Sequence, residues 1–586
     1  MELLSGNEAI ARGAWEAGAH IGVAYPGTPS TETMEVFARM PGVYAEWATN
    51  EKVAVEVGVG ASAAGARVLV TMKHVGVNIA ADPLFTAAYT GVGGALVVLA
   101  ADDPGMHSSQ DEQDSRYYAM AAHIPLLEPA DSAEARAFTR DAYDLSERFD
   151  VPFFIRSTVR ISHAKCPTDV GPRTDVEKKP YAKDESKWVM MPAFARPRRV
   201  NLIERDEALR AWADECPYNV VEKRDARIGI VCAGATYQHV REALPDASVL
   251  KLGLSWPLPE KLLHEFAASV DDVYVIEEAS AYLSDAVKAA GIVPSAPKRP
   301  IPRAGELTPG DIRIAFGAEV PAHIDAPEGI PGRPPALCPG CPHRPVFREL
   351  HRMRAIVTGD IGCYTLGNAK PLDAIDTCLC MGAGITMAQG LKVAEPDAKQ
   401  VAFIGDSTFF ASGMTGVANA VYNAHDIVIC VLDNRTTAMT GDQPHPGTGD
   451  TLMGTKSDPL DVEAVLSALG VRMIEHANPH CLDESIDAVK RSLDFAGPSA
   501  VIFEAPCVNL IRPASACIVD QDACTKCRRC ITAIGCPAIG FMDGRITIDE
   551  TICMGCGQCV QVCPYGAMTV PDGMPVEVRT GKEAHA

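Results

Sequence analysis

Eight cysteines near the end of the chain repeat one spacing twice, and this repeat restricts the fold more than any other feature of the sequence. Each copy has three cysteines separated by two residues, then a fourth directly before proline. Three thiolates at this spacing hold three corners of a four-iron, four-sulfur cluster, and the fourth cysteine serves the other cluster. The repeat therefore predicts a two-cluster, ferredoxin-like module over residues 515–575. The first cluster set is Cys524, Cys527, Cys530 and Cys563, and the second is Cys553, Cys556, Cys559 and Cys536.

The two copies differ in one loop, because five residues separate Cys530 from Cys536 where three separate Cys559 from Cys563. The longer loop leaves the number of thiol ligands unchanged. A zinc module is the simpler alternative, but eight cysteines in this doubled order favour iron–sulfur clusters.

A second group of cysteines comes from separate loops of an earlier segment. Cys338 and Cys341 stand in Cys-Pro-Gly-Cys, Cys363 ends Gly-Asp-Ile-Gly-Cys, and Cys507 follows a late apolar run. Buried thiols are the simpler interpretation, since cysteine is among the most buried residue types. Four cysteines in loops of one domain instead favour a third cluster. We expect the other cysteines to be structural: Cys166, Cys216, Cys232, Cys378, Cys380, Cys430, Cys481 and Cys517.

The chain is too long for one hydrophobic core, since it has 586 residues. Its composition, 47% hydrophobic and 22% charged, is typical of a soluble globular protein. A net charge of −22 argues against a nucleic acid partner. The sequence has no apolar run of membrane-spanning length and does not start with a basic region and an apolar core, so we expect a cytoplasmic protein without membrane contact.

Apolar runs of strand length alternate with helical patterns through most of the sequence, which predicts an α/β fold with parallel, doubly wound sheets. Pro-rich and charged stretches mark the expected boundaries. We predict α/β domains over residues 1–165, 226–292 and 337–512, with linkers at 166–225 and 293–336 before the terminal module.

One stretch, Val401–Gly449, reads as strand, helix and strand. Ligands collect at the carboxyl ends of such parallel strands, and Asp406 and Asn434 fall at those ends. A carboxylate and an amide oxygen suit Mg²⁺ that also binds phosphate. An ordinary crossover with an aspartate in its turn is the plain alternative.

This stretch resembles the thiamine diphosphate motif, Gly-Asp-Gly followed by a double Asn, although Ser407 replaces its last Gly and Asp433 its first Asn. The resemblance implies Mg²⁺ bound by Asp406, Asn434 and the carbonyl of Thr436, beside Gly405 and Ser407. His343 and the segment Gly382, Ala383 and Gly384 are further candidates for contacts with the diphosphate.

The whole chain resembles the large subunits of the indolepyruvate branch of the 2-oxoacid:ferredoxin oxidoreductases. The resemblance rests on GNEAIARGAWEAG, AYPGTPSTE, NEKVAVEVGVGAS, VTMKHVGVN, LCPGCPHR, GDIGCYTLG, GDSTFF, LDNRTTAMTG and the doubled cysteine repeat. That branch has histidine where this chain has Ala411 and Asp442.

The family resemblance implies a pyrimidine-binding domain at residues 1–165, a transketolase C-terminal-like domain at 226–292 and a diphosphate-binding domain at 337–512. It assigns activation of thiamine to Glu51, and binding of the substrate carboxylate to Thr28 and Arg116. A helix-start acid and a surface ion pair are the plain interpretations of Glu51 and Arg116.

The implied reaction converts an aryl 2-oxoacid and coenzyme A to an aryl-acetyl-CoA and CO₂, with electrons passing through the clusters to ferredoxin. The family also implies a smaller subunit of roughly 200 residues, in an α₂β₂ assembly. Two alternatives are a non-oxidative thiamine-dependent decarboxylase and a non-catalytic electron-transfer scaffold.

Overall fold

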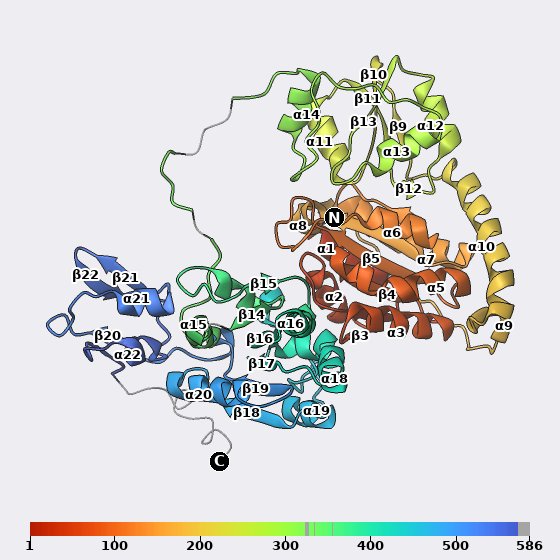
Figure 1. The fold of residues 1–586 in the computed structure, drawn as a ribbon. Helices are drawn as coiled ribbons and strands as arrows, with labels where there is room; N and C mark the ends of the chain where they lie inside the picture. The colour runs from red at the N-terminus through yellow and green to blue at the C-terminus, as the bar shows by residue number, and fades with distance from the viewer. Residues whose placement is uncertain (323–326, 333, 354, 572–586) are drawn as a thin grey trace. The chain divides into compact units, whose positions relative to one another are not determined.

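The computed structural model describes residues 1–322, 327–332, 334–353 and 355–571. Its contacts divide the chain into two compact units, Met1–Asp325 and Ala326–Ala586 (Figure 1). Each unit is built around its own α/β core, as the alternating pattern predicts. Within the described residues, no helix combines the length and the apolar character needed to cross a membrane.

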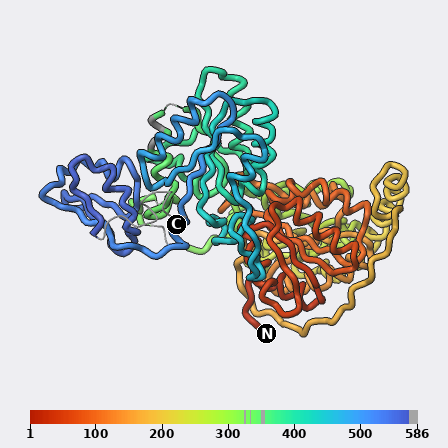
Figure 2. Tube along the Cα trace, turned by 90° about the horizontal axis from the view of Figure 1, so that it is seen from below, coloured from red at the N-terminus to blue at the C-terminus, as the bar shows by residue number. Residues whose placement is uncertain are grey.

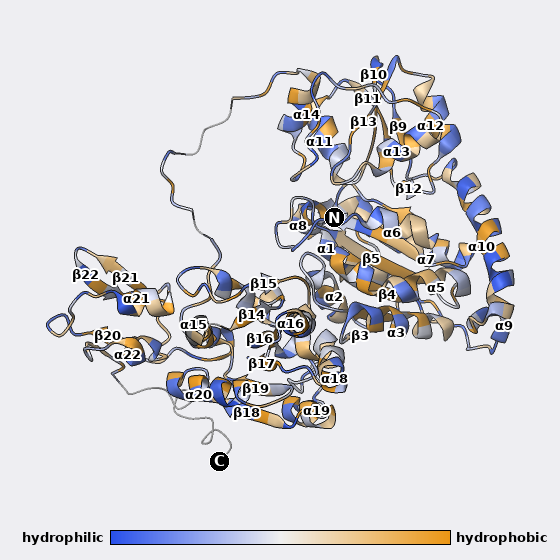
Figure 3. Cartoon of the chain, viewed as in Figure 1, coloured by the Kyte–Doolittle hydropathy of each residue, from blue (hydrophilic) through white to orange (hydrophobic). Residues whose placement is uncertain are grey.

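The first unit is organised around a seven-stranded sheet with the order β12-β6-β7-β5-β4-β2-β3. All neighbours in it are parallel except β12, which pairs antiparallel with β6 at one edge. The central strands β4 and β5 are buried along their whole length and appear in hydrophobic colours in Figure 3. Helices pack on both faces, so the strands read as continuous apolar runs. The strands are β2 (Ile21–Ala24), β3 (Tyr44–Trp47), β4 (Val68–Lys73), β5 (Leu96–Asp102), β6 (Leu126–Leu127), β7 (Phe153–Thr158) and β12 (Leu254–Trp256), and the helices among them are α1 (Gly6–Glu16), α2 (Thr31–Ala38), α3 (Glu51–Ala63), α4 (His74–Ile79), α5 (Ala81–Thr90), α6 (Ser115–Ala122) and α7 (Ser132–Phe149).

A smaller subdomain follows, with a four-stranded sheet in the order β13-β10-β11-β9. It corresponds to the predicted small α/β segment, but its chain also supplies β12 to the larger sheet. Its elements are β9 (Val220–Glu222), β10 (Asp225–Ala233), α11 (Ala235–Ala243), β11 (Ala247–Leu252), α12 (Glu260–Ala267), β13 (Asp272–Val275), α13 (Tyr282–Ala289) and α14 (Pro309–Phe316).

The two predicted linkers contain folded structure. Residues 166–225 include the long helix α10 (Pro192–Ala213), which packs against α5, and the strand β9. Arg205 on α10 is buried and donates hydrogen bonds to the carbonyls of Asp150 and Ala88, at 2.8 and 2.5 Å. Residues 293–336 include α14, which packs on α11, while 323–326 and 333 lie outside the described residues.

The second unit contains a six-stranded parallel sheet with the order β15-β14-β16-β17-β19-β18. Alternate residues of β16 and β17 face two separate apolar clusters, which shows that both faces of the sheet are covered. Helices α15 and α20 contribute to one cluster, and α16, α18 and α19 to the other. The elements are β14 (Ile356–Gly359), β15 (Thr377–Cys378), β16 (Gln400–Gly405), β17 (Val428–Asp433), β18 (Met473–Ala477), β19 (Ser499–Glu504), α15 (His343–Met353), α16 (Ala383–Ala394), α17 (Asp406–Thr408), α18 (Met414–Tyr422), α19 (Val462–Ala468) and α20 (Leu482–Leu493).

The terminal module is small and has a core rich in cysteine. Two short antiparallel pairs, β20 with β23 and β21 with β22, accompany two one-turn helices. Figure 2 shows the module as a lobe at the blue end of the chain. Its elements are β20 (Ile518–Val519), α21 (Arg529–Ile534), β21 (Ile539–Met542), β22 (Arg545–Ile548), α22 (Gln558–Val562) and β23 (Met568–Thr569).

Candidate functional site

Asp406 and Asn434 lie directly after the neighbouring parallel strands β16 and β17. Both side chains are buried. The backbone N–H groups of Ser407 and Arg435 donate to the two oxygens of Asp406, at 2.9 and 2.8 Å. These donors fix the orientation of the Asp406 carboxyl group, whose oxygens are ligands that Mg²⁺ prefers.

His445, which the sequence analysis missed, is a third partner of Asp406. Its Nδ1 accepts a hydrogen bond from the N–H of Gly447 at 3.2 Å, so its Nε2 carries the proton and donates to Asp406 at 3.0 Å. The ring stacks on Phe410 with 6.0 Å between centroids. His445 therefore fixes the orientation of Asp406, and the only signal in the sequence was a histidine in a Pro/Gly-rich loop.

The other predicted diphosphate-site residues gather around Asn434. Its Oδ1 accepts from the N–H of Thr436 at 3.2 Å, and its Nδ2 lies 3.5 Å from Nε2 of His343. Burial lowers the pKa of His343 to about 4, so this ring is neutral. Ser407 stands where the thiamine diphosphate motif has its last glycine. Its hydroxyl accepts a hydrogen bond from the hydroxyl of Thr437 at 2.9 Å.

Gly382, Ala383 and Gly384 form the start of α16, with Gly382 at φ +83°. A Cβ atom on Gly384 would lie 2.8 Å from the carbonyl oxygen of Phe403, so only glycine fits there. Gly405 is similarly close to the ring of Tyr364. The fully buried Asp360, another residue that the sequence analysis missed, accepts from the N–H of Gly384 at 3.4 Å, and burial raises its pKa to about 7.

The ends of β16 and β17 also border a cavity of about 140 Å³ whose lining includes Asp406, Asp433 and His445. Burial and the neighbouring charge of Asp406 raise the pKa of Asp433 to about 7. Taken together, an oriented carboxylate, an amide, a neutral histidine and a glycine-bearing helix start fit Mg²⁺ and a diphosphate.

The four cysteines of the predicted third cluster lie near one another. The thiol of Cys341 interacts electrostatically with those of Cys363 and Cys338, and Cys363 with Cys507. Cys507 adjoins the diphosphate site, because its N–H donates to the carbonyl of Asn434 at 3.0 Å. The predicted cluster position is thus one hydrogen bond from a predicted Mg²⁺ ligand.

In the terminal module, the structure brings together the first cysteine set and three members of the second. One pocket is lined by all four cysteines of the first set, Cys524, Cys527, Cys530 and Cys563. In the second set, Cys556 interacts electrostatically with Cys536 and Cys553. Within the described residues, no three Cys, His, Asp or Glu side chains converge as ligands of a single metal ion do.

Glu51 is the first residue of α3 in the first unit, where Asn50 caps the helix by accepting from the N–H of Val53 at 3.0 Å. The Glu51 side chain is buried and packs so closely on Gly76 that a Cβ there would lie 2.5 Å away. Burial raises the pKa of Glu51 to about 7. A carboxyl group with this pKa can hold or release a proton near neutral pH.

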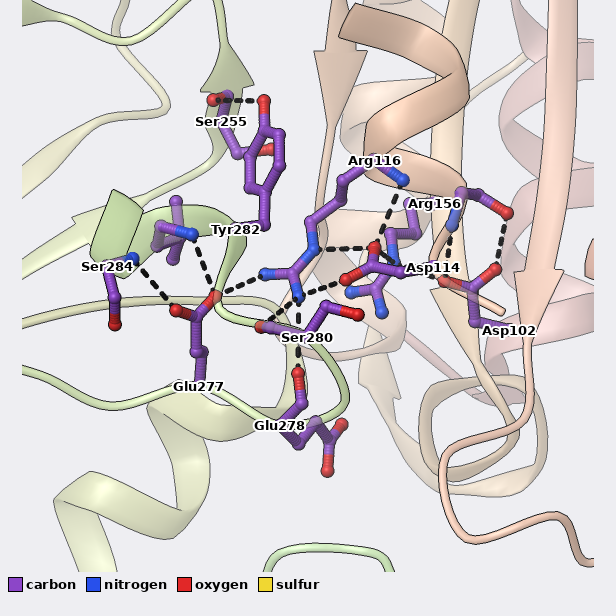
Figure 4. Close-up of polar contacts among 12 residues, drawn as sticks. Asp102, Asp114, Arg116, Arg156, Ser255, Glu277, Glu278, Ser280, Tyr282 and Ser284 are labelled. Carbon is purple, nitrogen blue, oxygen red and sulfur yellow. Dashed lines mark hydrogen bonds and ion pairs between the residues drawn. The ribbon is translucent and has the colours of Figure 1, made fainter. Parts of the chain in front are cut away.

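Thr28 and Arg116, the predicted carboxylate-binding residues, have different surroundings. Thr28 is half-buried in the turn after β2. Arg116 is only 2% exposed, and Figure 4 shows its guanidinium surrounded by acceptors. It donates two hydrogen bonds to Asp114, at 2.8 and 2.6 Å, and one to Glu277 at 3.1 Å.

These contacts join α6 of the larger sheet to the loop before α13 of the small subdomain. Arg116 also bonds to the carbonyl of Glu278 at 3.2 Å, and its guanidinium lies 5.0 Å from the ring centroid of Tyr282. These contacts give Arg116 a structural role between the two parts of the first unit. In this conformation its guanidinium has no pair of unused N–H donors for a substrate carboxylate.

Family models match three parts of the chain. Residues 12–220 match the thiamine diphosphate-binding region of pyruvate flavodoxin/ferredoxin oxidoreductases, which includes α10. Residues 360–503 match the C-terminal TPP-binding domain of thiamine pyrophosphate enzymes, and residues 546–569 match a 4Fe-4S binding domain.

Curated relatives match nearly the whole chain. The indolepyruvate oxidoreductase subunit IorA of Archaeoglobus fulgidus is 39% identical over 604 residues, which cover 96% of this chain and 97% of the relative. The IorA subunit of Methanothermobacter thermautotrophicus is 39% identical, with 97% of both chains covered. That of Pyrococcus abyssi is 40% identical, with 96% of both covered.

The fold and the three domain matches define the class of the protein, an oxidoreductase that uses thiamine diphosphate and iron–sulfur clusters. Its chemistry is the oxidative decarboxylation of a 2-oxoacid. The chain belongs to the family of indolepyruvate oxidoreductase IorA subunits. The predicted family and fold class are thereby confirmed.

Proposed function

We propose that the chain oxidatively decarboxylates indolepyruvate and related aryl 2-oxoacids, with coenzyme A as acyl acceptor and ferredoxin as electron acceptor. The observation that carries the proposal is the hydrogen bond between Cys507 and the carbonyl of Asn434. It connects a candidate cluster ligand to the candidate diphosphate site. A non-oxidative decarboxylase has no electrons to export and no use for such a connection.

The second unit would hold the diphosphate end of the cofactor. Asp406, Asn434 and the carbonyl of Thr436 would bind Mg²⁺, while His343 and the Gly382–Gly384 backbone would contact the diphosphate. When bound, thiamine diphosphate supplies the carbanion stabilisation that loss of CO₂ requires. His445 and two backbone N–H groups already orient the carboxylate oxygens of Asp406, so binding of Mg²⁺ would need little rearrangement of this side chain.

Glu51 would share a proton with a ring nitrogen of the aminopyrimidine. Its buried position and its pKa of about 7 support this role, since a general acid–base group works best near the pH at which it operates. The hydroxyl of Thr28 would donate to the substrate carboxylate. Arg116 is not part of this proposal, because its donors are already used by Asp114, Glu277 and the carbonyl of Glu278.

The assembly we propose contains two copies of this chain and two of a smaller subunit of roughly 200 residues. The relatives are themselves named as subunits, which supports a partner. Three four-iron clusters are proposed, two in the terminal module and one held by Cys338, Cys341, Cys363 and Cys507.

The test compares the anaerobically purified chain with and without its copurifying smaller protein. Indolepyruvate, phenylpyruvate and an aliphatic 2-oxoacid are supplied with coenzyme A and ferredoxin, and reduced ferredoxin and acyl-CoA are quantified. We expect coenzyme A-dependent reduction only with both polypeptides, and faster turnover of aryl substrates. Aldehyde release without electron transfer would identify a non-oxidative decarboxylase, and absence of bound thiamine would identify an electron-transfer scaffold.

A further inference from the structure

Arg344, the second residue of α15, is a buried cation that contacts two cysteine-bearing loops. Its Nε donates to the carbonyl of Cys338 at 3.0 Å, and its Nη2 to that of Leu337. Its Nη1 donates to the carbonyls of Ile534 and Gly535, at 3.2 and 2.6 Å. One guanidinium thus joins the loop of the candidate third cluster to the loop that leads to Cys536.

The charge of Arg344 has no carboxylate partner among the side chains that the structure describes. Its hydrogen bonds among the described residues go to backbone carbonyls, those of Leu337, Cys338, Ile534 and Gly535. An isolated buried cation is costly unless anionic groups surround it. Leu337 and Cys338 belong to the loop of the candidate third cluster, whereas Ile534 and Gly535 directly precede Cys536 of the second set, so Arg344 lies between the two sets.

Buried hydrogen bonds hold the same two regions together independently of Arg344. Gln558, which precedes Cys559, is 2% exposed, and its Nε2 donates to the carbonyl of Cys341 at 3.1 Å. Gln561 donates to the carbonyl of His480 at 2.7 Å. A Cβ on Gly340 would lie 2.7 Å from Met554, so the two loops are in close contact. The second cysteine set therefore faces the thiamine domain.

We propose that Arg344 is a positioning residue for electron transfer between the candidate third cluster and the second set, Cys553, Cys556, Cys559 and Cys536. This inference rests on the proposed function, because it requires clusters at both positions. A positive charge between two anionic clusters favours the reduced state of each, since reduction adds one negative charge. The guanidinium of Arg344 also donates hydrogen bonds to both loops, which orients the loops beside each other. Clusters held by Cys338, Cys341, Cys363 and Cys507 and by the second set would supply one-electron chemistry here, the first being oxidised and the second reduced by one electron.

The test uses Arg344→Gln, which removes the charge, and Arg344→Lys, which keeps it but loses the fork. Arg545→Gln is the surface control, because Arg545 is exposed on β22 and takes part in the sheet through its backbone. Iron and thiamine contents are measured first. Redox titrations monitored by electron paramagnetic resonance then give the midpoint potentials of the clusters. Rates of ferredoxin reduction are measured with the partner subunit present.

In Arg344→Gln we expect midpoint potentials of two clusters to become more negative and ferredoxin reduction to slow about tenfold or more. Arg344→Lys should keep potentials near those of the wild type while slowing ferredoxin reduction, and Arg545→Gln should change neither. Unchanged potentials in Arg344→Gln with full iron would overturn the electrostatic role. If Arg344→Gln fails to retain iron, Arg344→Lys decides: wild-type rates in that variant would overturn the positioning role.

The result also separates this inference from the proposed function. Wild-type protein with two clusters instead of three would refute the third cluster, yet a potential shift confined to the second set would still establish the effect of Arg344 there. Full iron, full thiamine and normal aryl-acetyl-CoA formation with no effect of either substitution would refute the role of Arg344 and leave the proposed function intact.

Discussion

The Glu51 carboxyl group is buried, and burial raises its pKa to about 7. In Glu51→Gln we expect thiamine diphosphate to remain bound, because the proposed contacts with Mg²⁺ and the diphosphate do not include Glu51. Exchange of the thiazolium C2 proton should fall about 10²–10⁴-fold, as is typical when a general acid–base group is lost. Asp406→Ala should instead lose the cofactor. Proton exchange can be followed by nuclear magnetic resonance, and an unchanged rate in Glu51→Gln would identify another carboxylate as the activator.

The raised pKa of Glu51 also predicts how stability depends on pH in the protein without thiamine. Folding raises the pKa of Glu51 from 4.5 to about 7, so the folded state binds the proton more tightly. The free energy of unfolding should therefore fall as pH rises from about 4.5 to 7, by about 3 kcal/mol from this group. Glu51→Gln lacks this term, so its Tm relative to the wild type should rise over that range. A Tm difference that is the same at pH 5 and pH 8 would contradict the assignment.

His445 gives a prediction about metal affinity. His445→Ala removes a hydrogen bond that orients Asp406, so Mg²⁺-dependent binding of thiamine diphosphate should weaken about 10–100-fold. His476 is the matched control, because it lines the same cavity but is bonded to Glu463 and Glu504 instead of Asp406. Isothermal titration calorimetry distinguishes the two variants, and equal weakening in both would argue against a specific role for His445.

The sequence predicted those site residues that can be recognised from their place in a short sequence motif. Asp406 and Asn434 follow apolar strands, and the structure places them side by side after β16 and β17. His445, Asp360 and Arg344 were missed because their roles depend on contacts with residues distant in the chain. Arg116 was interpreted through its family position, and the acceptor Glu277 lies 161 residues away.

At the scale of elements, strands were easier to predict than the segments between them. The buried strands of both sheets appear as apolar runs, and β16, α18 and β17 follow the predicted pattern closely. Helix α10 was predicted as linker because the segment is charged and has Pro197 inside it. Its stability comes from tertiary contacts such as those of Arg205, which no local pattern reveals.

Arg116 tests how α6 is held against the small subdomain. Arg116→Met removes the closest cation from the buried Asp114 and from Glu277, which should destabilise the first unit by about 3–5 kcal/mol. Arg160→Met is the control, because the Arg160 side chain is 54% exposed in its pair with Glu306 and should contribute less than about 1 kcal/mol. Thermal unfolding measures both. A raised KM for the 2-oxoacid in Arg116→Met without loss of Tm would restore the predicted role in substrate binding.

At the scale of the whole molecule, the cysteine sets predict the iron content. Three four-iron clusters require about twelve iron atoms per chain, and Cys553→Ser should lower this by about four while thiamine stays bound. Cys338→Ser should lower iron by a similar amount from the other position. Cys166→Ser, in β8 (Lys165–Thr168), should change nothing. Elemental analysis checks these values, and zinc in place of iron would contradict them.

The strand β12 has a consequence for how the first unit can be dissected. It is only three residues long, but it pairs with the outer side of β6 and so covers the edge of the larger sheet. A fragment that ended before Leu254 would leave the backbone N–H and C=O groups of β6 open to pairing with any other chain. We expect such a fragment to self-associate, whereas one that continues through the small subdomain should remain monodisperse at the same concentration.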